Sequence, residues 1–136
     1  MEAAESPSDF YTGPAMNPLH VLIVEEYRDT ADLLARWVAL AGHDSRVCHT
    51  GSQAEQLVTE YRPDVVLLDI GLPDTDGWEL APFLRRANPA MKIFAVTAYQ
   101  SLDDRQRSHD AGIDLHLGKP LRRETILSLL SLPTAS

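Results

Sequence analysis

The stretch Val65-Val66-Leu67-Leu68-Asp69-Ile70 decides the fold, because five aliphatic residues here carry a single carboxylate. An uninterrupted aliphatic run of this length, with Pro63 before it and Gly71 after it, is typical of a central parallel strand that is covered on both faces. Ligands of open parallel sheets bind at the carboxyl ends of the strands, and Asp69 lies at that end. The sequence therefore predicts a buried strand that delivers Asp69 to a binding site.

Four other segments, at 20–24, 45–49, 91–96 and 113–117, are also predicted strands, and polar residues follow three of them. Glu25 and Glu26 come directly after the first, Thr97 ends the fourth strand along the chain, and Lys119 follows the last. Because the carboxyl ends of parallel strands meet at one edge of the sheet, we expect these side chains to lie near Asp69.

Segments with helical periodicity alternate with the strands. The first is predicted to have Asp29 as its N-cap, and the fourth, at 102–111, is capped by Ser101 and is polar almost all round. Pro82 falls inside the third, so we expect that helix to start late or to be kinked near its first turn. Five strands alternating with five helices, without an internal repeat, predict a single α/β domain with right-handed crossovers.

Composition limits the classes of function. The 136 residues carry 12 basic and 20 acidic side chains, a net charge of −8, which disfavours binding to nucleic acid or to anionic membranes. No apolar run reaches the roughly 18 residues that a membrane helix needs. Cys48 is the only cysteine, which excludes an internal disulfide and indicates a reducing compartment, the cytoplasm.

We divide the chain into three parts. Residues 1–18 contain three prolines and three acidic residues and read as a flexible leader, in which Met16 offers an alternative start. Residues 19–131 form the domain. Residues 132–136 are a short C-terminal tail, which we expect to be too short for an output domain.

The predicted cluster of side chains indicates a particular chemistry. Three carboxylates in one pocket repel each other unless some are protonated or a divalent cation neutralises them. A site built of oxygen ligands suits Mg²⁺, which uses only one or two carboxylates and keeps several waters. Thr97 and Lys119 are then available to bind an anion beside the metal. These are the parts of a phosphoryl-transfer site, in which positioning and charge neutralisation do most of the catalysis.

Together these motifs resemble the receiver domain of two-component response regulators, a module also found in hybrid histidine kinases. The matching residues, in order along the chain, are Val24-Glu25-Glu26, Leu68 to Pro73 with Asp76-Gly77, Val96-Thr97-Ala98 and Gly118-Lys119-Pro120. The resemblance covers about Leu19 to Leu130. It implies a doubly wound (βα)5 domain whose five-stranded parallel sheet has the flavodoxin-like order 2-1-3-4-5.

The resemblance also implies roles for single residues. Asp69 would accept a phosphoryl group from a partner histidine and become an acyl phosphate. Mg²⁺ would be held by Glu25, Glu26, Asp69 and the backbone carbonyl of Gly71. Receiver domains usually have aspartate where this chain has Glu26, and the extra methylene carries that carboxylate about 1.5 Å further from the backbone.

A second group of residues is implied in binding and switching. Lys119 and Thr97 would each bind a phosphoryl oxygen, and the peptide bond before Pro120 would be cis. The switch would combine the Thr97 hydroxyl with the residue three positions before the lysine, which is His116 here rather than the usual tyrosine or phenylalanine. Gly71 and Tyr99 occupy positions that tune hydrolysis of the acyl phosphate in this family.

The resemblance leads to a functional prediction. We expect a single-domain response regulator that catalyses only its own phosphorylation and dephosphorylation. Its partners would be a histidine kinase or a histidine-containing phosphotransfer protein and a downstream protein, and the resemblance also allows a phosphorylation-linked homodimer. The alternative is a pseudo-receiver binding module in which Glu26 impairs Mg²⁺ binding and phosphorylation.

Two other classes of function do not match the residues. A phosphatase of the haloacid dehalogenase type needs a second aspartate two positions after the nucleophile, where this chain has Gly71. A flavodoxin would bind the flavin phosphate in the loop after the first strand, where Glu25 and Glu26 would repel it.

Overall fold

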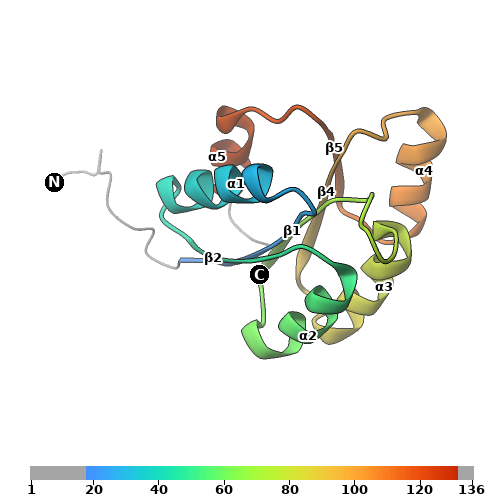
Figure 1. The fold of residues 1–136 in the computed structure, drawn as a ribbon, viewed down its shortest axis with the longest axis horizontal. Helices are drawn as coiled ribbons and strands as arrows, with labels where there is room; N and C mark the ends of the chain where they lie inside the picture. Colours follow the sequence, from blue (N-terminus) through green and yellow to red (C-terminus); the bar gives the residue numbers. More distant parts are fainter. Residues whose placement is uncertain (1–17, 132–136) are drawn as a thin grey trace, which may run out of the picture.

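Five parallel strands lie side by side in the order β2-β1-β3-β4-β5 in the computed structural model, which describes residues 18–131 (Figure 1). The strands are β1 (His20–Val24), β2 (Asp44–Cys48), β3 (Val65–Leu68), β4 (Lys92–Thr97) and β5 (Leu115–Gly118). The helices are α1 (Arg28–Leu40), α2 (Gly51–Tyr61), α3 (Gly77–Ala87), α4 (Leu102–Asp110) and α5 (Arg123–Ser131). The predicted fold class and strand order are confirmed. The predicted leader, apart from Pro18, and the predicted tail lie outside the described residues.

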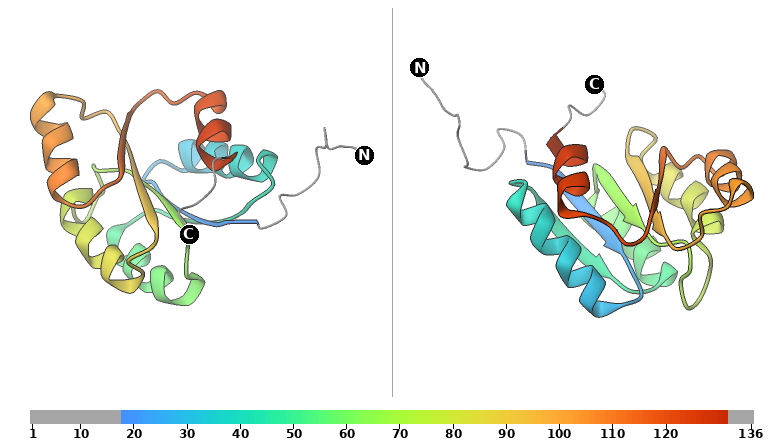
Figure 2. Two further views of the ribbon diagram at one scale, coloured as in Figure 1. Left: turned by 180° about the vertical axis from the view of Figure 1, so that it is seen from behind. Right: turned by 90° about the horizontal axis from the view of Figure 1, so that it is seen from above.

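The helices cover both faces of the sheet (Figures 1 and 2). One face packs against α1 and α5, and the other packs against α2 and α3. Successive residues of a strand point to opposite faces, so Val21 and Ile23 of β1 face α1 and α5 while Leu22 and Val24 face α2 and α3. Helix α4 lies beyond β5 at the edge of the sheet (Figure 1). No helix between residues 18 and 131 has the length and apolar character needed to cross a membrane.

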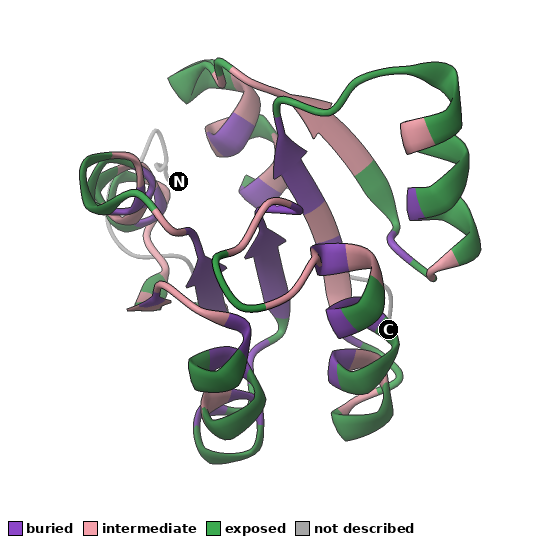
Figure 3. Cartoon of the chain, turned by 45° about the vertical axis from the view of Figure 1, so that its right-hand side comes forward, coloured by how far each residue is buried: buried purple, intermediate pink, exposed green. Residues whose placement is uncertain are grey.

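The aliphatic run at residues 65–68 is buried at every position, as expected for a central strand. Figure 3 shows the inner strands in the buried class and the outer sides of the helices in the exposed class. The pairing of Val24 with Leu68, and of Leu68 with Ala95, aligns the carboxyl ends of the three central strands. The packing of the apolar core and the pairing of the strands therefore set how deeply the polar residues that follow these strands are buried.

One predicted helix cap is confirmed and another is wrong. Ser101 forms the predicted cap of α4 as part of a capping box, while Thr50 and Asp76, which the sequence analysis does not predict as caps, cap α2 and α3. The N-cap of α1 is Tyr27 rather than Asp29, which lies in the first turn. Helix α3 begins at Gly77, five residues before Pro82, so it does not start late.

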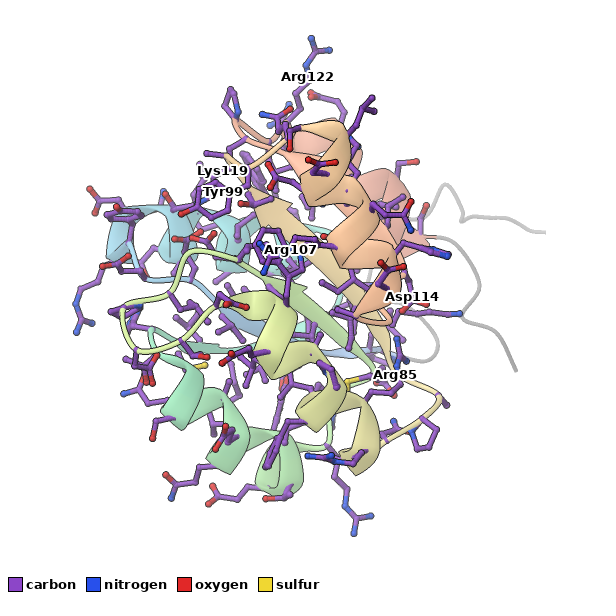
Figure 4. All side chains as sticks on the ribbon, turned by 90° about the vertical axis from the view of Figure 1, so that its right-hand side faces the viewer. Arg85, Tyr99, Arg107, Asp114, Lys119 and Arg122 are labelled. Carbon is purple, nitrogen blue, oxygen red and sulfur yellow. The ribbon has the colours of Figure 1, made fainter. Side chains whose placement is uncertain are left out.

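Strand β5 begins at Leu115 instead of residue 113. The strand starts later because Arg85 of α3 binds the loop before β5, at the end of the sheet opposite Asp69. Its guanidinium donates to the Gly112 carbonyl at 2.7 Å and to the Asp114 carboxylate at 2.9 Å, and also to the Met91 carbonyl. Figure 4 shows Arg85 and Asp114 together at this end. The Asp114 carboxylate also accepts from the Ile93 amide at 2.8 Å, so a side chain takes one backbone donor of β4, although the Asp114 amide still donates to the Ile93 carbonyl.

His43 joins the two ends of the described chain. Its Nδ1 accepts a hydrogen bond from the Leu19 amide at 2.9 Å, and its Nε2 lies 2.9 Å from the Leu130 carbonyl. A carbonyl can only accept, so Nε2 carries the hydrogen and the ring is neutral. The imidazole therefore connects the residue before β1 to the last turn of α5.

We expect His43→Ala to lower the free energy of unfolding by about 1–3 kcal/mol, because it leaves a part-buried amide and a part-buried carbonyl without their partner. Urea denaturation followed by circular dichroism measures the change. An unaltered midpoint would show that water replaces both hydrogen bonds without loss.

Candidate functional site

The aligned strands bring four of the predicted polar residues to one edge of the sheet. Glu25 follows β1, Asp69 follows β3, Thr97 ends β4 and Lys119 follows β5. Glu25 and Asp69 are only 1% and 5% exposed, and Thr97 is buried as well. The backbone connects these positions directly, because the Asp69 amide donates to the Val24 carbonyl and the Lys119 amide donates to the Thr97 carbonyl, each at 2.9 Å.

The Lys119 ammonium lies between two buried carboxylates. Its Nζ is 2.8 Å from Glu25 Oε1 and 3.2 Å from Asp69 Oδ2. The other oxygens accept backbone hydrogen bonds, Glu25 Oε2 from the Tyr27 amide at 3.1 Å and Asp69 Oδ1 from the Gly71 amide at 3.2 Å. The peptide bond between Lys119 and Pro120 is cis, as the family resemblance implies.

One lysine only partly compensates two buried carboxylates. Burial and the negative charge of Glu25 raise the pKa of Asp69 to about 6, although Lys119 acts in the opposite direction. Burial alone would lower the pKa of Lys119, but the close contact with Glu25 and the charges of Asp69 and Glu25 outweigh burial and raise that pKa. The Asp69 carboxylate is therefore destabilised in the metal-free protein and would be favoured by a further positive charge.

The buried donor set fits a hard divalent cation. Glu25 Oε1 is buried and, although it is close enough to Lys119 for an ion pair, it accepts no well-directed hydrogen bond. A buried carboxylate oxygen that is paired only with an ammonium group and lies beside a second carboxylate is a suitable ligand for Mg²⁺. Glu25 and Asp69 would hold such an ion.

Glu26 does not join the two buried acids in this structure. Its side chain is exposed to an intermediate degree, and within residues 18–131 no three histidine, cysteine or acidic side chains gather at metal-ligand spacing. The predicted ligand set of Glu25, Glu26, Asp69 and the Gly71 carbonyl therefore stays a prediction, with two of its acids in place.

A cavity of about 250 Å³ opens over Asp69. Its lining residues are Tyr27, Asp69, Gly71, Thr97, Ala98, Tyr99 and Lys119. Two exposed tyrosines contribute to the walls, Tyr27 with its ring 5.8 Å from Lys119 Nζ and Tyr99 beside Lys119 in Figure 4. The cavity is open and large enough to admit a small anionic group to the carboxylate.

Thr97 and His116, the two predicted switch residues, are both bound to the backbone of Tyr99. The Tyr99 amide donates to Thr97 Oγ1 at 3.1 Å, and the Tyr99 carbonyl lies 2.6 Å from His116 Nε2. His116 Nδ1 is 2.8 Å from the Ser108 hydroxyl. The histidine is thus engaged at both ring nitrogens, which a phenylalanine at this position could not be.

The hydrogen bonds continue from His116 to α3. Ser108 Oγ accepts from the Trp78 indole N–H at 3.0 Å, and the Trp78 ring stacks with the Tyr99 ring at a centroid distance of 6.1 Å. Sequence analysis does not identify Ser108, which is the buried residue of a charged helix. A lone serine among charged residues carries no pattern that would single it out.

Comparisons with known proteins identify the family. The family model described as the response regulator receiver domain matches residues 21–131. "Response regulator MprA" of Mycobacterium sp. (strain KMS) is 32% identical over 111 residues, which are 82% of this chain and 48% of that protein. The same-named protein of Mycobacterium avium is 31% identical over 110 residues, 81% of this chain and again 48% of the relative. The chain thus spans about half the length of these curated relatives.

Solved structures share the architecture. A CheY-like response regulator receiver domain protein from Methanospirillum hungatei superposes with a TM-score of 0.80 at 26% identity, covering 85% of this chain and 92% of that one. A two-component response regulator from Clostridium difficile reaches 0.80 at 22% identity over 83% and 93% of the two chains, which shows a common fold. The chain therefore belongs to the response regulator receiver domain family.

The raised pKa of Asp69 predicts a pH dependence of stability. Because the folded value of about 6 exceeds the ordinary value of 3.8, the folded protein binds the proton more tightly than the unfolded chain does. Protonation of Asp69 therefore stabilises the folded protein. This stabilisation is fully present below the ordinary pKa of 3.8 and is lost as the pH rises through the folded pKa of about 6. Without divalent metal, we expect the stability of wild type to fall by about 1 kcal/mol relative to Asp69→Asn between pH 5 and pH 7.

Urea unfolding of both proteins at the two pH values, with a chelator present, measures this difference. Equal changes in the wild type and in the Asp69→Asn variant would mean that Asp69 does not carry the proton.

Proposed function

We propose that this chain is a phosphorylatable receiver domain in which Asp69 accepts a phosphoryl group from a phosphohistidine of a partner protein. The observation that carries the proposal is the placement of Asp69, nearly buried, beside Glu25 and Lys119 in the lining of an open cavity. The domain would act on no other substrate and would catalyse only its own phosphorylation and dephosphorylation.

The reaction needs an ionised Asp69. One carboxylate oxygen attacks phosphorus, the phosphorus–nitrogen bond of the phosphohistidine breaks, and the departing imidazole takes up a proton. The Lys119 ammonium, 3.2 Å from Asp69 Oδ2, would bind an oxygen of the transferred group and offset its added charge. Thr97 lines the same cavity, and its hydroxyl would bind a second phosphoryl oxygen.

Mg²⁺ is the proposed cofactor. When bound it neutralises charge on the carboxylates and on the phosphoryl oxygens. Glu25 and Asp69 would hold it with the Gly71 carbonyl, and Glu26 would join by rotation of its side chain. The burial of Glu25 Oε1 without a well-directed hydrogen bond supports this assignment.

A histidine kinase or a histidine-containing phosphotransfer protein would donate the group in the cytoplasm. An apolar groove of about 350 Å³ adjoins Lys119 and supports contact with a protein partner. Leu33 and Trp37 of α1 line it together with Pro120 and Leu121. The aspartyl phosphate would then alter contacts with a downstream protein or with a second copy of the chain.

Incubation of the protein with a small phosphodonor and Mg²⁺ is expected to add one phosphoryl group, detected by intact mass, and Asp69→Asn is expected to add none. The reason is that Asp69 is the acceptor whose carboxylate lines the cavity. Unmodified wild type at saturating Mg²⁺ would reject the proposal in favour of a pseudo-receiver module that signals by protein contacts alone.

Glu26→Asp tests the departure from the usual acid. Shortening the side chain by one methylene is expected to raise both the affinity for Mg²⁺ and the rate of labelling by the phosphodonor, because Mg²⁺ tolerates little deviation from octahedral geometry. Calorimetric titration and the time course of the mass shift measure the two effects. Identical behaviour of Glu26→Asp and wild type would mean that the longer side chain reaches the metal equally well.

A further inference from the structure

The segment from His49 to Ser52 lies between the two loops that carry the buried acids. It joins the end of β2 to the first turn of α2. It binds Glu25 in the loop after β1 and Asp74 in the loop after β3. None of the residues in this segment is assigned to the site by the sequence motifs, yet the segment contacts both loops.

His49 holds the backbone of Glu25. Its Nδ1 lies 2.8 Å from the Glu25 carbonyl, and Arg28 Nη1 lies 3.2 Å from its Nε2. A carbonyl only accepts and a guanidinium only donates, so the ring is the neutral tautomer with hydrogen on Nδ1. The Glu25 amide in turn donates to the Cys48 carbonyl at 3.0 Å. Residues 48 and 49 thus bind both backbone polar groups of Glu25.

Asp74 binds the same segment from the loop after β3. Its Oδ1 accepts from the Gly51 amide at 2.8 Å and its Oδ2 accepts from the Ser52 amide at 2.9 Å. These amides lower the pKa of Asp74, the Gly51 amide most strongly. They belong to the first turn of α2, where amides have no partner within the helix, and the Thr50 hydroxyl accepts from the Gln53 amide. The carboxylate therefore fastens the loop after β3 to the start of α2.

Gly51 makes this approach possible. A Cβ atom at position 51 would lie 2.4 Å from Thr75 Cγ2 and 3.4 Å from Asp74 Oδ1. The loop after β3 therefore packs so closely on the helix start that a larger residue would force the Thr75 side chain to move.

We propose that His49 and Asp74 are positioning residues that hold the Glu25 loop and the Asp69 loop in register through one shared segment, residues 49–52. The inference rests on the proposed function, because the purpose of this arrangement is to keep two repelling carboxylates at the spacing that a cation requires. Neither residue touches the phosphoryl group. Each acts through the backbone, His49 on Glu25 and Asp74 on the loop that contains Gly71.

Amide hydrogen exchange by NMR in metal-free protein tests the shared segment. The Tyr27 amide reports on the first loop because it donates to Glu25 Oε2, and the Gly71 amide reports on the second because it donates to Asp69 Oδ1. We expect His49→Ala to accelerate exchange roughly fivefold at Tyr27 and also to accelerate it at Gly71, and Asp74→Ala to act on both amides as well. Acceleration confined to the nearer loop in each variant would overturn the proposal.

A calorimetric titration with Mg²⁺ tests the consequence for the site. Both variants are expected to bind the ion about tenfold more weakly than wild type, in the range found when residues that orient metal ligands are removed. His49→Asn is expected to restore most of the affinity, because its amide N–H replaces the Nδ1–H donor. Wild-type affinity in both alanine variants would overturn the positioning role.

His43→Ala is the matched control, because that histidine also makes two hydrogen bonds to backbone groups but joins Leu19 to Leu130. His43→Ala is expected to lower the free energy of unfolding without changing the affinity for Mg²⁺. The ratio of the exchange rate of the Gly71 amide to the rate of exchange by global unfolding is expected to stay the same. If wild type itself binds no Mg²⁺, the proposed function fails, whereas the exchange measurements still decide whether the segment couples the loops.

Discussion

The burial of two carboxylates side by side is the constraint on which the rest of the structure depends. Glu25 and Asp69 are placed in nearly buried positions by two adjacent parallel strands, and their repulsion is met by a single ammonium group. Breaking such a cluster is costly, because an uncompensated buried charge remains. The apolar layers on both faces of the sheet must supply the stability that the site lacks. The protein thus retains a destabilising cluster, which under the proposed function would favour the binding of a cation and a phosphoryl group.

The fold could be predicted because its signals are local. A fully buried strand such as β3 needs an uninterrupted aliphatic run, and a charged residue directly after the run marks the carboxyl end. Alternation of such runs with helical periodicity leaves few topologies open. Asp69, Glu25, Thr97 and Lys119 were found in this way, and the structure brings all four together. The predictions failed where a tertiary contact overrides propensity, as at the start of β5, where Arg85 and Asp114 occupy the backbone groups.

The supports of the site could not be predicted because each joins residues that are distant in sequence. His49 and Glu25 are separated by 24 positions, and Asp74 and Gly51 by 23. A histidine or an aspartate in a loop has many ordinary uses, and no spacing rule connects it to a particular backbone atom. Only the register of the sheet and the packing of α2 determine these partners. Sequence patterns therefore locate groups that carry charge into the core, whereas the residues that orient them become visible only in three dimensions.

The two sides of the site differ in how firmly they are held. On the α2 side, hydrogen bonds from His49 and Asp74 to main-chain groups are backed by the apolar core beneath α2 and α3. On the α4 side, Thr97 and His116 meet at the backbone of Tyr99, and α4 contributes a single buried side chain, Ser108. Segments with few buried apolar contacts open at the lowest free energy. Under the proposed function, a change in charge at Asp69 would therefore be accommodated more easily by the Tyr99 loop and α4 than by α2.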